Sequence, residues 1–515
     1  MLLSIYGQVN HQSLPSSCFR GPGSLAKPFK PSIHRQVSPV DQGIPLSETR
    51  WETLNSRGFW GSILAKLTSI PASPMAYLLT GKAIANRGPL LERTSDYSAK
   101  SEAARLNQQC VCVTLDRTAI VRNLAHQLGE KADEILSSDA WQQFFSNVAV
   151  FVSGDDLGQM QAIVGAVEAA ASLPEYQQQV RSWAPASGQL NPGPAGAFMG
   201  YDFHLGEDGP RLIEINTNAG GAFLNAELAR AQVQCCGGST RAARAEDFDA
   251  AVIGQFESEW RAQRGSGRPE RVAIVDDDPT GQHLYPEFRL AQQMFRKHGL
   301  DALILAPSEL KYDAGALYSG DRRIDLVYNR LVDFGLDAPE HAALRAAWLG
   351  GGAVITPNPF AHALFADKRN LAVLSDHAIL EGWGLSKDHA QRLHSGIPTT
   401  IRVNADDAEN LWQQRRDWFF KPVSGHGSKG VYRGSKLTRS TFARILESDY
   451  IAQAYVPPSE RRVLVDDEPE MLKVDVRLYT YRGSLLLAAA RLYRGQATNL
   501  RTPGGGFAPV LLKQG

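Results

Sequence analysis

The chain has 515 residues, in which 54 lysine and arginine side chains balance 54 aspartate and glutamate side chains. Its pI near 7.2 excludes a general positive field that would attract nucleic acid or an anionic membrane, so we expect a small soluble ligand. No apolar run approaches the ~20 residues of a membrane span, and the N-terminus lacks the basic and apolar regions of a secretory signal.

The cysteine pattern predicts a reducing, cytoplasmic location. The five cysteines match neither an even disulfide framework nor a paired zinc motif. They are Cys18, Cys110, Cys112, Cys235 and Cys236. The adjacent pair at 235 and 236 is interpreted as two buried thiols, with a redox pair as the alternative.

The first part of the chain carries no obvious chemistry. Residues 1–48 are rich in Pro, Ser and Gly, which predicts a disordered tail. Residues 49–185 are predicted to be mainly helical, because segments such as 116–128 and 156–171 place apolar residues at three-to-four spacing. Prolines and glycines between 185 and 196 then mark a boundary near residue 186.

A β-hairpin is predicted next. Two short alternating runs, Tyr201–Leu205 and Leu212–Ile215, flank the turn signal Asp208-Gly209. The length of the loop decides which side chains share a face, because successive residues of a strand point to opposite faces.

A loop of two residues would set Asp202 opposite Ile215 and leave Glu214 behind the sheet. A loop of three residues sets Asp202 opposite Glu214, with Asn216 two residues along the same face. We expect the three-residue loop, which sends Ile213 and Ile215 into the core.

The hairpin would then present two carboxylates and an amide oxygen at one point. Asp202, Glu214 and Asn216 supply the oxygen ligands that Mg²⁺ takes when phosphates and water complete its coordination. The sequence therefore predicts a magnesium site here. The alternative is a solvated acidic face, which is common on antiparallel hairpins. A helix is expected at about 222–234.

A β-α-β unit follows the hairpin. Its expected elements are a strand at Arg271–Val275, a helix at Pro286–His298 and a strand at Ala302–Leu305. A third strand, Ile324–Tyr328, leads into Arg330. No Gly-x-Gly-x-x-Gly motif follows the first strand, which argues against a nicotinamide-binding Rossmann domain.

The ends of these strands deliver charged side chains to one rim of the sheet, where open α/β sheets bind ligands. The residues are Asp276, Asp277, Asp278 and Arg330. The three aspartates are interpreted as solvated residues at a strand end, with a second metal cluster as the alternative.

A phosphate loop is predicted within residues 419–431, where a Gly- and Ser-rich stretch separates two strands. Glycines at 425, 427 and 430 let backbone N–H groups turn toward an anion, while Lys421 and Lys429 supply positive charge. The loop returns as a strand, so it is not a Walker A motif. A flexible surface turn is the alternative.

The remaining sequence predicts a hinge and a charged strand. Strand backbone next to Gln453 could pair with an adenine edge. Residues 472–478 alternate charged with apolar side chains, so one charged face lies over one apolar face. Further polar residues follow at Arg491, Arg494, Asn499 and Arg501.

Taken together, these motifs resemble the ATP-grasp superfamily, in which two α+β lobes clamp a nucleotide. The metal-binding hairpin is similar to the end of an ordinary ATP-grasp ligase, such as D-alanine ligase, yet here it precedes the phosphate loop. The chain therefore resembles a circularly permuted member. The order, with Asn358-Pro359 and Asp367-Lys368 between the two parts, is similar to glutathionylspermidine synthetase and eukaryotic glutathione synthetase. The resemblance covers residues 190–515.

The resemblance implies a role for each motif. Magnesium would be held by Asp202, Glu214 and Asn216. Phosphates would contact two lysines, Lys368 and Lys421, and a lid that contains Ser424, Gly425, Gly427, Ser428 and Gly430. Adenine and ribose would meet Gln453, Val456 and Glu460. Arg491 would stabilise the transferring phosphoryl group, and Arg330 would bind an acidic substrate.

The implied fold is a mixed α/β and α+β, circularly permuted ATP-grasp with a Rossmann-like subdomain and a helical N-terminal region. The expected parts are the tail 1–48, the helical region 49–185, the metal-binding half 186–265, the Rossmann-like substrate subdomain 266–357 and the nucleotide-binding half with its lid, 358–515. Gly200 stands where glutathionylspermidine synthetases carry an arginine, and no amidase cysteine is recognisable, so glutathione and spermidine are not assigned as substrates.

The implied activity is that of an ATP- and Mg²⁺-dependent carboxylate–amine ligase. It would form a C–N bond through an acyl phosphate, release ADP, and act on a small amino acid, peptide or polyamine. The expected partners are a small-molecule acid and an amine, without nucleic acid or membrane, and a homodimer is left open. The alternatives are an ATP-dependent phosphotransferase and a non-catalytic nucleotide-binding protein.

Overall fold

The computed structural model describes residues 100, 102–112, 120–122, 124–125, 144–231, 240–244, 247–425, 430–496, 498–499 and 502–513. All of them belong to one unit of the chain, Ala85–Gly515. The predictions for residues 1–48, for Cys18, Cys235 and Cys236, for Lys429, Gly427 and Ser428 of the lid, and for most of the helix at 116–128 lie outside the described residues.

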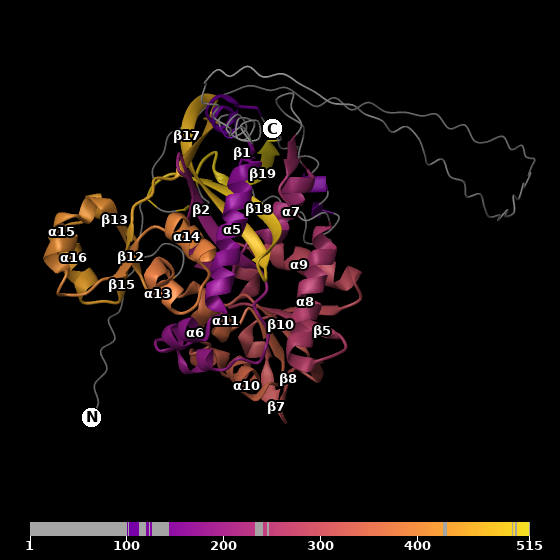
Figure 1. Cartoon of the computed structure of the whole chain (residues 1–515). Coiled ribbons are helices and arrows are strands. Elements are labelled where there is room, and N and C mark those ends of the chain that lie inside the picture. Colours follow the sequence, from indigo (N-terminus) through magenta and orange to yellow (C-terminus); the bar gives the residue numbers. More distant parts are fainter. Residues whose placement is uncertain are drawn as a thin grey trace, which may run out of the picture. The chain divides into compact units, whose positions relative to one another are not determined.

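The largest sheet has eight strands and joins distant parts of the sequence (Figure 1). Its main path runs β1-β19-β18-β17-β2-β3, while β16 pairs with β17 and β4 pairs with β19. The bounds are β1 Val150–Ser153, β2 Met199–Gly206, β3 Gly209–Asn216, β4 Thr240–Ala242, β16 Ser459–Val465, β17 Glu468–Tyr481, β18 Ser484–Tyr493 and β19 Gly506–Lys513. Because β17 pairs with β2, the charged strand near the C-terminus lies beside the acidic hairpin.

The alternation predicted for residues 472–478 is confirmed in β17. Val474, Val476 and Leu478 are buried in the core, whereas Lys473 and Arg477 line a cavity on the other face of the strand. The strand thus separates apolar packing from charged groups.

The hairpin pairs Asp202 with Glu214 as predicted, but for a different reason. The turn has two residues, since Gly206 pairs with Gly209, and the pairing shifts between Asp202 and Phe203. The expected three-residue loop is therefore wrong.

The shift leaves Ile213 as an extra residue in β3, a β-bulge. In a regular strand Leu212 and Glu214 would share a face. The extra residue separates them, so that Leu212 enters the core and Glu214 lines the cavity. Ile215 is buried as expected, although it also contributes to the cavity wall. Ile213 is only half-buried and lines the cavity, which corrects its predicted place in the core.

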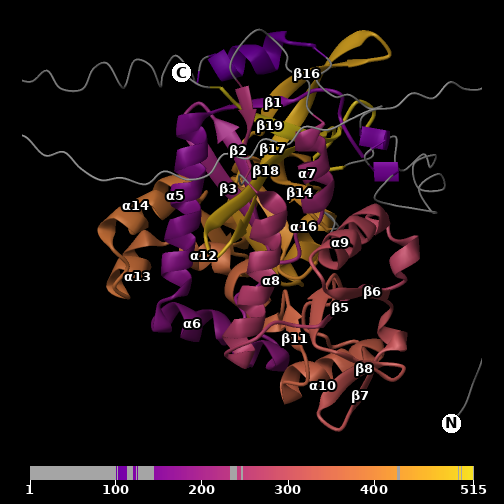
Figure 2. The ribbon, with the colours of Figure 1, turned by 90° about the vertical axis from the view of Figure 1, so that its right-hand side faces the viewer.

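A parallel sheet of four strands confirms the predicted β-α-β unit (Figure 2). The strands run in the order β11-β10-β5-β6. Their bounds are β5 Arg271–Val275, β6 Asp301–Leu305, β10 Leu326–Asn329 and β11 Val354–Thr356, and helix α9, Tyr285–Lys297, connects β5 to β6. The strand predicted from Ile324 begins later, because Ile324 ends β9 of a small antiparallel sheet. That sheet contains β7 Lys311–Asp313, β8 Ala316–Ser319 and β9 Arg322–Ile324.

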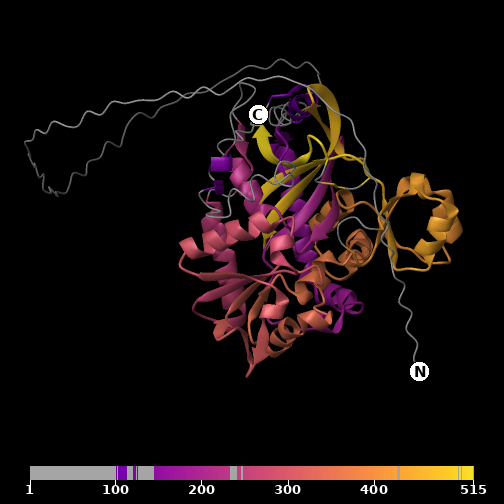
Figure 3. The ribbon, with the colours of Figure 1, turned by 180° about the vertical axis from the view of Figure 1, so that it is seen from behind.

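A second four-stranded sheet, here called the small sheet, carries the predicted phosphate loop (Figure 3). Its order is β12-β15-β13-β14, with bounds β12 Thr400–Arg402, β13 Trp418–Pro422, β14 Tyr432–Arg433 and β15 Tyr450–Ala454. Helices α15 Ala408–Gln413 and α16 Arg439–Leu446 cover it through a separate apolar cluster that includes Phe420 and Phe442.

The other helices surround these sheets. They are α5 Gly154–Ala171, α6 Pro174–Arg181, α7 Ala222–Arg230, α8 Phe248–Arg264, α10 Ala342–Gly350, α11 Pro359–Ala361, α12 Asn370–Leu374, α13 His377–Gly382 and α14 Lys387–Gly396. Helix α5 begins with Ser153, whose side chain accepts from Asp156 N–H, and packs against β3 and α14. Within the described residues no helix is both long and apolar enough to cross a membrane.

The part of region 49–185 that the structure describes is not purely helical. Besides α5 and α6 it contains β1, which pairs in parallel with β19 and so belongs to the largest sheet. The predicted boundaries near 186, 266 and 358 stay predictions, since the described residues form one unit.

Candidate functional site

A cavity of about 400 Å³ brings together the acidic hairpin, the segment after β11 and the small sheet. Among the described residues, the basic side chains that line it outnumber the acidic ones. The basic side chains are Lys368, Lys421, Arg433, Lys436, Lys473, Arg477 and Arg491, and the acidic ones are Glu214 and Asp367. The arrangement favours a polyanionic ligand.

Asp202 is fully buried beside two guanidinium groups. Arg477 donates from Nε to Oδ1 at 2.6 Å and from Nη2 to Oδ2 at 2.7 Å, and Nη2 of Arg491 lies 2.8 Å from Oδ2. Asn216 Nδ2 also donates to Oδ2, at 3.1 Å. Burial alone would raise the pKa of Asp202, but the two arginines outweigh it and hold the pKa well below its ordinary value. Both oxygens of Asp202 are therefore engaged.

Arg491 is fixed by a second carboxylate. Its Nε donates to Oδ1 of the buried Asp475 at 2.6 Å, and Thr498 Oγ1 donates to Oδ2 of the same carboxylate at 2.6 Å. The pairing of β17 with β18 sets Asp475 directly opposite Arg491. Burial would lower the pKa of Arg491, but Asp202 and Asp475 raise it, so the guanidinium is a permanent cation in the cavity wall.

Glu214 remains accessible from the cavity, with 34% of its side chain exposed. Its Oε1 lies 3.3 Å from Nζ of Lys368. Burial would raise the pKa of Glu214, but the ammonium groups of Lys368 and Lys421 lower it below the ordinary value. Glu214 is therefore an anionic oxygen donor at neutral pH.

Lys421 enters the cavity from β13 and is held by two oxygens. Its Nζ donates to the carbonyl of Ile213 at 2.7 Å and to Oε1 of Gln453 at 2.8 Å. Burial lowers the pKa of Lys421 to about 8, while nearby Glu214 opposes this shift. The bulge at Ile213 thus has a second effect, because it supplies the carbonyl that orients Lys421.

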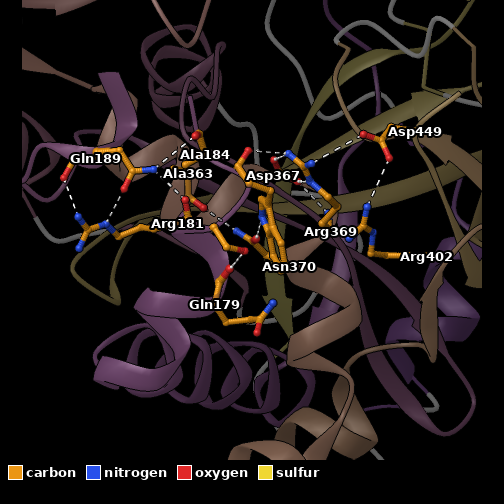
Figure 4. Close-up of polar contacts among 12 residues, drawn as sticks. Gln179, Arg181, Ala184, Gln189, Ala363, Asp367, Arg369, Asn370, Arg402 and Asp449 are labelled. Carbon is orange, nitrogen blue, oxygen red and sulfur yellow. Dashed lines mark hydrogen bonds and ion pairs between the residues drawn. The ribbon is translucent and has the colours of Figure 1, made fainter. Parts of the chain in front are cut away.

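The segment that carries Lys368 is anchored by its neighbours (Figure 4). Arg369 donates from Nε to Asp367 Oδ1 at 3.0 Å and from Nη2 to Oδ2 at 2.6 Å. The same Nη2 donates to the carbonyl of Trp183 at 3.1 Å. The guanidinium carbons of Arg369 and Arg402 lie 5.4 Å and 5.9 Å from the ring centroid of Trp183. The indole therefore links the segment to β12 of the small sheet.

Asp449 closes this network on the side of the small sheet. One oxygen lies 3.5 Å from Arg402 Nη2 and the other 3.8 Å from Arg369 Nη1, as Figure 4 shows. With 63% of the Asp449 side chain exposed, these ion pairs are screened by solvent.

Among the remaining predicted nucleotide contacts, the structure places five on or beside the cavity wall. Ser424, Gly425, Gln453 and Val456 line it. Gly430 adopts a φ of +71°, which suits a glycine, and its carbonyl accepts from Tyr450 Oη at 3.0 Å.

Besides Gly430 and the buried Asp202, two further predicted site residues that the structure describes do not line the cavity. Glu460 is exposed on β16, where it pairs with the cavity-lining Lys473. Arg330 is buried at the end of β10, where it donates to Oδ1 of Asn218 and lies over the ring of Tyr328. Asn218 itself lines the cavity, so Arg330 reaches it through that side chain.

Three aromatic side chains, His204, Phe334 and His362, are among the cavity residues that sequence reasoning missed. His204 lies two residues after Asp202 in β2, and its Nδ1 is 2.8 Å from the carbonyl of Val456. Phe334 and His362 stack with their ring centroids 4.0 Å apart. Alternation along β2 could have indicated His204. The stacked pair joins the loop after β10 to the helical turn His362–Ala366, and the sequence carries no signal for this contact.

The donor set fits Mg²⁺ in part. Glu214 and Asn216 offer accessible oxygens, which suits an ion that takes one or two protein ligands and completes its shell from phosphates and water. Asp202 fits less well because its oxygens already accept from arginines. No group of three or more His, Cys, Asp or Glu within the described ranges could hold a metal by itself.

No model of a known protein family matches the sequence, and no curated protein matches it either. The fold shows structural similarity to ATP-grasp ligases and related proteins. A glutathione synthetase-like effector, GSS30 from Globodera pallida, is 12% identical with a TM-score of 0.47, covering 78% of this chain and 99% of its own.

Two further structures are less similar. A candidate gamma-glutamylcysteine synthetase from Methylobacillus flagellatus is 12% identical with a TM-score of 0.41, covering 70% of this chain and 89% of its own. The ATP-grasp ligase PsnB, in complex with a minimal precursor, Mg and ADP, is 15% identical with a TM-score of 0.25, covering 46% and 87%. Because these three TM-scores are below 0.5, the function is inferred from the residues of the cavity.

Proposed function

We propose that this protein is an ATP- and Mg²⁺-dependent carboxylate–amine ligase that forms a C–N bond and releases ADP. The observation that carries the proposal is the single cavity shared by Glu214 and Asn216 of the hairpin and by Lys368 and Lys421, which come much later in the chain. A phosphorylated ligand and its metal need these two kinds of group at one place.

The lysines would neutralise the phosphates. Lys368 and Lys421 lie in the cavity with Ser424 and Gly425 at the start of the predicted phosphate loop. The base would lie toward Gln453 and the backbone up to Val456. Mg²⁺, held by Glu214 and Asn216 when bound, would supply charge neutralisation between the phosphate oxygens.

Arg491 would stabilise the transferring phosphoryl group. A carboxylate oxygen of the acid attacks the γ-phosphorus as ADP leaves, and the amine nitrogen then attacks the acyl carbon as phosphate leaves. Negative charge spreads over the phosphoryl oxygens in the first step, where fixed cations are most effective. Asp202 and Asp475 hold the Arg491 guanidinium in place, so it needs no reorganisation.

We also infer that the chain is a circularly permuted ATP-grasp protein. The metal-binding hairpin, β2 and β3, precedes the phosphate loop in sequence, while β17 and β18 complete the same sheet from the C-terminal part. The acid and the amine are proposed to be amino acids, peptides or polyamines.

A phosphate-release screen of amino acids, peptides and polyamines with Mg²⁺ and ATP tests the proposal. Mass spectrometry of the products should show an amide between two of the added compounds. Glu214→Gln should lower the turnover rate by about 10² to 10³, the usual loss for a pre-organised charge contact. Glu207→Gln, at the exposed turn of the same hairpin, is the matched control and should keep the wild-type rate.

Two results would contradict the proposal, one for the type of reaction and one for the role of Glu214. A stable phosphoester product would show a phosphotransferase instead. Wild-type turnover in Glu214→Gln, with the circular dichroism spectrum unchanged, would remove this carboxylate from the reaction.

A further inference from the structure

A buried histidine lies between two carboxylates near the cavity. His341 precedes helix α10, and only 2% of its side chain is exposed. Its Nδ1 lies 2.7 Å from Asp333 Oδ2, and its Nε2 lies 3.0 Å from Asp277 Oδ1. The three residues come from the loop after β10, the start of α10 and the end of β5, so the histidine joins three elements.

This geometry requires an imidazolium. A carboxylate oxygen only accepts, so each ring nitrogen must carry a proton to form both hydrogen bonds. A neutral imidazole would turn a lone pair toward one carboxylate and lose that contact. Burial would lower the pKa of His341, but the hydrogen bonds to Asp277 and Asp333 raise it above its ordinary value.

The charges around the histidine favour its protonation. Asp276 is a third acidic group near it, and burial raises the pKa of this carboxyl to about 6 although Arg330 and His341 lower it. Farther out, Asp337 pairs with Arg345 at 3.1 Å. The titratable and charged groups that face the histidine or its partners are Asp276, Asp277, Asp333, Asp337, Arg330 and Arg345.

The clamped loop forms part of the cavity wall. Asp333 immediately precedes Phe334, which lines the cavity and stacks on His362 with an angle of 5° between the rings. The buried Leu331 and Leu336 fix the loop on either side of Phe334. The position of Asp333 therefore determines the position of the stacked pair Phe334 and His362, here called the wall.

This wall adjoins the proposed metal and phosphate contacts, where a second substrate has to meet the γ-phosphate, since Lys368 is close enough to add to the effect of burial in lowering the pKa of His362. His362 Nδ1 is 3.3 Å from Oγ1 of Thr217, the residue after Asn216. The side chain of Asn218 donates to the carbonyl of Leu331 at 2.9 Å, so the loop meets the chain just beyond the hairpin. The proposed base contact, Gln453, belongs to β15 of the small sheet.

We propose that His341 is a positioning residue: held as an imidazolium between Asp277 and Asp333, it fixes the Phe334–His362 wall against which the second substrate binds. The proposal rests on the proposed function in taking this end of the cavity as the place of the acid or amine. Titration of His341 then changes the affinity for that substrate and leaves the affinity for the nucleotide unchanged.

The direction of the pH dependence follows from the raised pKa of His341. The clamp is fully present below about pH 6.5, the ordinary value, and is lost as the pH rises through the higher value in the folded protein. Because one proton is involved, the affinity for the second substrate should fall by at most about tenfold per pH unit.

Hydrogen exchange of residues 331–341 at several pH values tests the clamp without any ligand. The amide of Ala338 donates to Asp333 Oδ2 at 2.8 Å and is the most direct probe. Its protection, corrected for the intrinsic exchange rate, should fall above about pH 6.5 in the wild type. His341→Gln should remove this dependence. His389→Gln, at a half-buried position of α14 that does not line the cavity, should keep it.

Protection of Ala338 that does not vary with pH in the wild type, or that varies equally in His341→Gln, would overturn the proposal. If His341→Gln fails to fold, Asp277→Asn serves, since half of that side chain is exposed. It removes one partner of the imidazolium, so the loss of protection should shift to lower pH, and an unshifted profile would overturn the proposal.

The kinetic arm uses the acceptor that the phosphate-release screen identifies. Between about pH 6.5 and about pH 7.5, below the pKa of about 8 of Lys421, the KM for this acceptor should rise with pH in the wild type and stay constant in His341→Gln. Over the same range kcat and the Mg²⁺·ADP affinity should change less than about twofold. A change in the Mg²⁺·ADP affinity as large as the change in the acceptor KM would contradict a role confined to the second substrate. If the protein does not bind Mg²⁺·ADP at all, the proposed function is rejected. Hydrogen exchange at Ala338 would still show whether His341 holds the loop as proposed.

Discussion

At the scale of single residues, Asp202 gives the cavity its fixed cations. Its two oxygens accept from Arg477 and lie beside Arg491, so one buried carboxylate holds both guanidinium groups at the wall. Without this carboxylate two buried cations would lose their main counter-charge. Removing one partner of such a buried arrangement is strongly destabilising.

Asp202→Asn should therefore lower the free energy of unfolding by about 3 to 5 kcal/mol. Chemical denaturation measures this difference, and Asp208→Asn at the exposed hairpin turn should change it by less than about 0.5 kcal/mol. Because the pKa of Asp202 is lowered by folding, its contribution is present above about pH 3.9 and is lost only as the pH falls through the lower folded value. Equal stability of Asp202→Asn and the wild type at neutral pH would refute this role.

Lys421 should make nucleotide binding depend on pH in the alkaline range, whereas Asp202 acts in the acidic range. Its pKa of about 8 means that the ammonium is present at pH 7 and is lost as the pH rises above that value. The affinity for Mg²⁺·ADP, measured by calorimetry, should then fall by up to about tenfold per pH unit. Lys421→Arg keeps the charge and should remove the decline. A decline that persists in Lys421→Arg would assign it to another group.

At the scale of elements, two local features set the site. The bulge in β3 separates Leu212 from Glu214 and turns the carbonyl of Ile213 toward Lys421. The contact of Trp183 with Arg369 anchors the segment of Lys368.

Trp183→Leu should weaken Mg²⁺·ADP binding by about three- to tenfold, because it removes two cation–π contacts worth about 0.5 to 1 kcal/mol each and so loosens the segment of Lys368. Trp412→Leu is the matched control. That indole also lies beneath two arginines, Arg415 and Arg439, but it contacts no part of the Lys368 segment in the contacts described.

The control should lose comparable stability in thermal unfolding and keep its Mg²⁺·ADP affinity within about twofold. A similar loss of affinity in both variants would show that global stability, and not the anchoring of Lys368, accounts for the effect.

At the scale of the whole described chain, the cavity depends on strand order. Asp202 in β2 meets Arg477 in β17 and Arg491 in β18 because these strands are neighbours in one sheet. The small sheet adds Lys421 to the same cavity. Groups from distant parts of the sequence are therefore held by backbone pairing as well as by their own contacts.

The sequence predicts part of this arrangement. Alternation and turn signals suffice for the hairpin, for β17 and for the β-α-β unit, because these depend on local periodicity. The bulge at Ile213 was not predictable from periodicity, which cannot show an extra residue in a strand. Neither were the partners of Asp202 or the stack of Phe334 on His362, which depend on strand order and on loop paths.

The most direct test of the account is a crystal structure of the protein with Mg²⁺ and a non-hydrolysable ATP analogue. We expect the metal about 2.1 Å from oxygens of Glu214 and Asn216, with phosphate oxygens in contact with Lys368 and Lys421. A nucleotide bound outside this cavity, or a metal that contacts neither Glu214 nor Asn216, would contradict it.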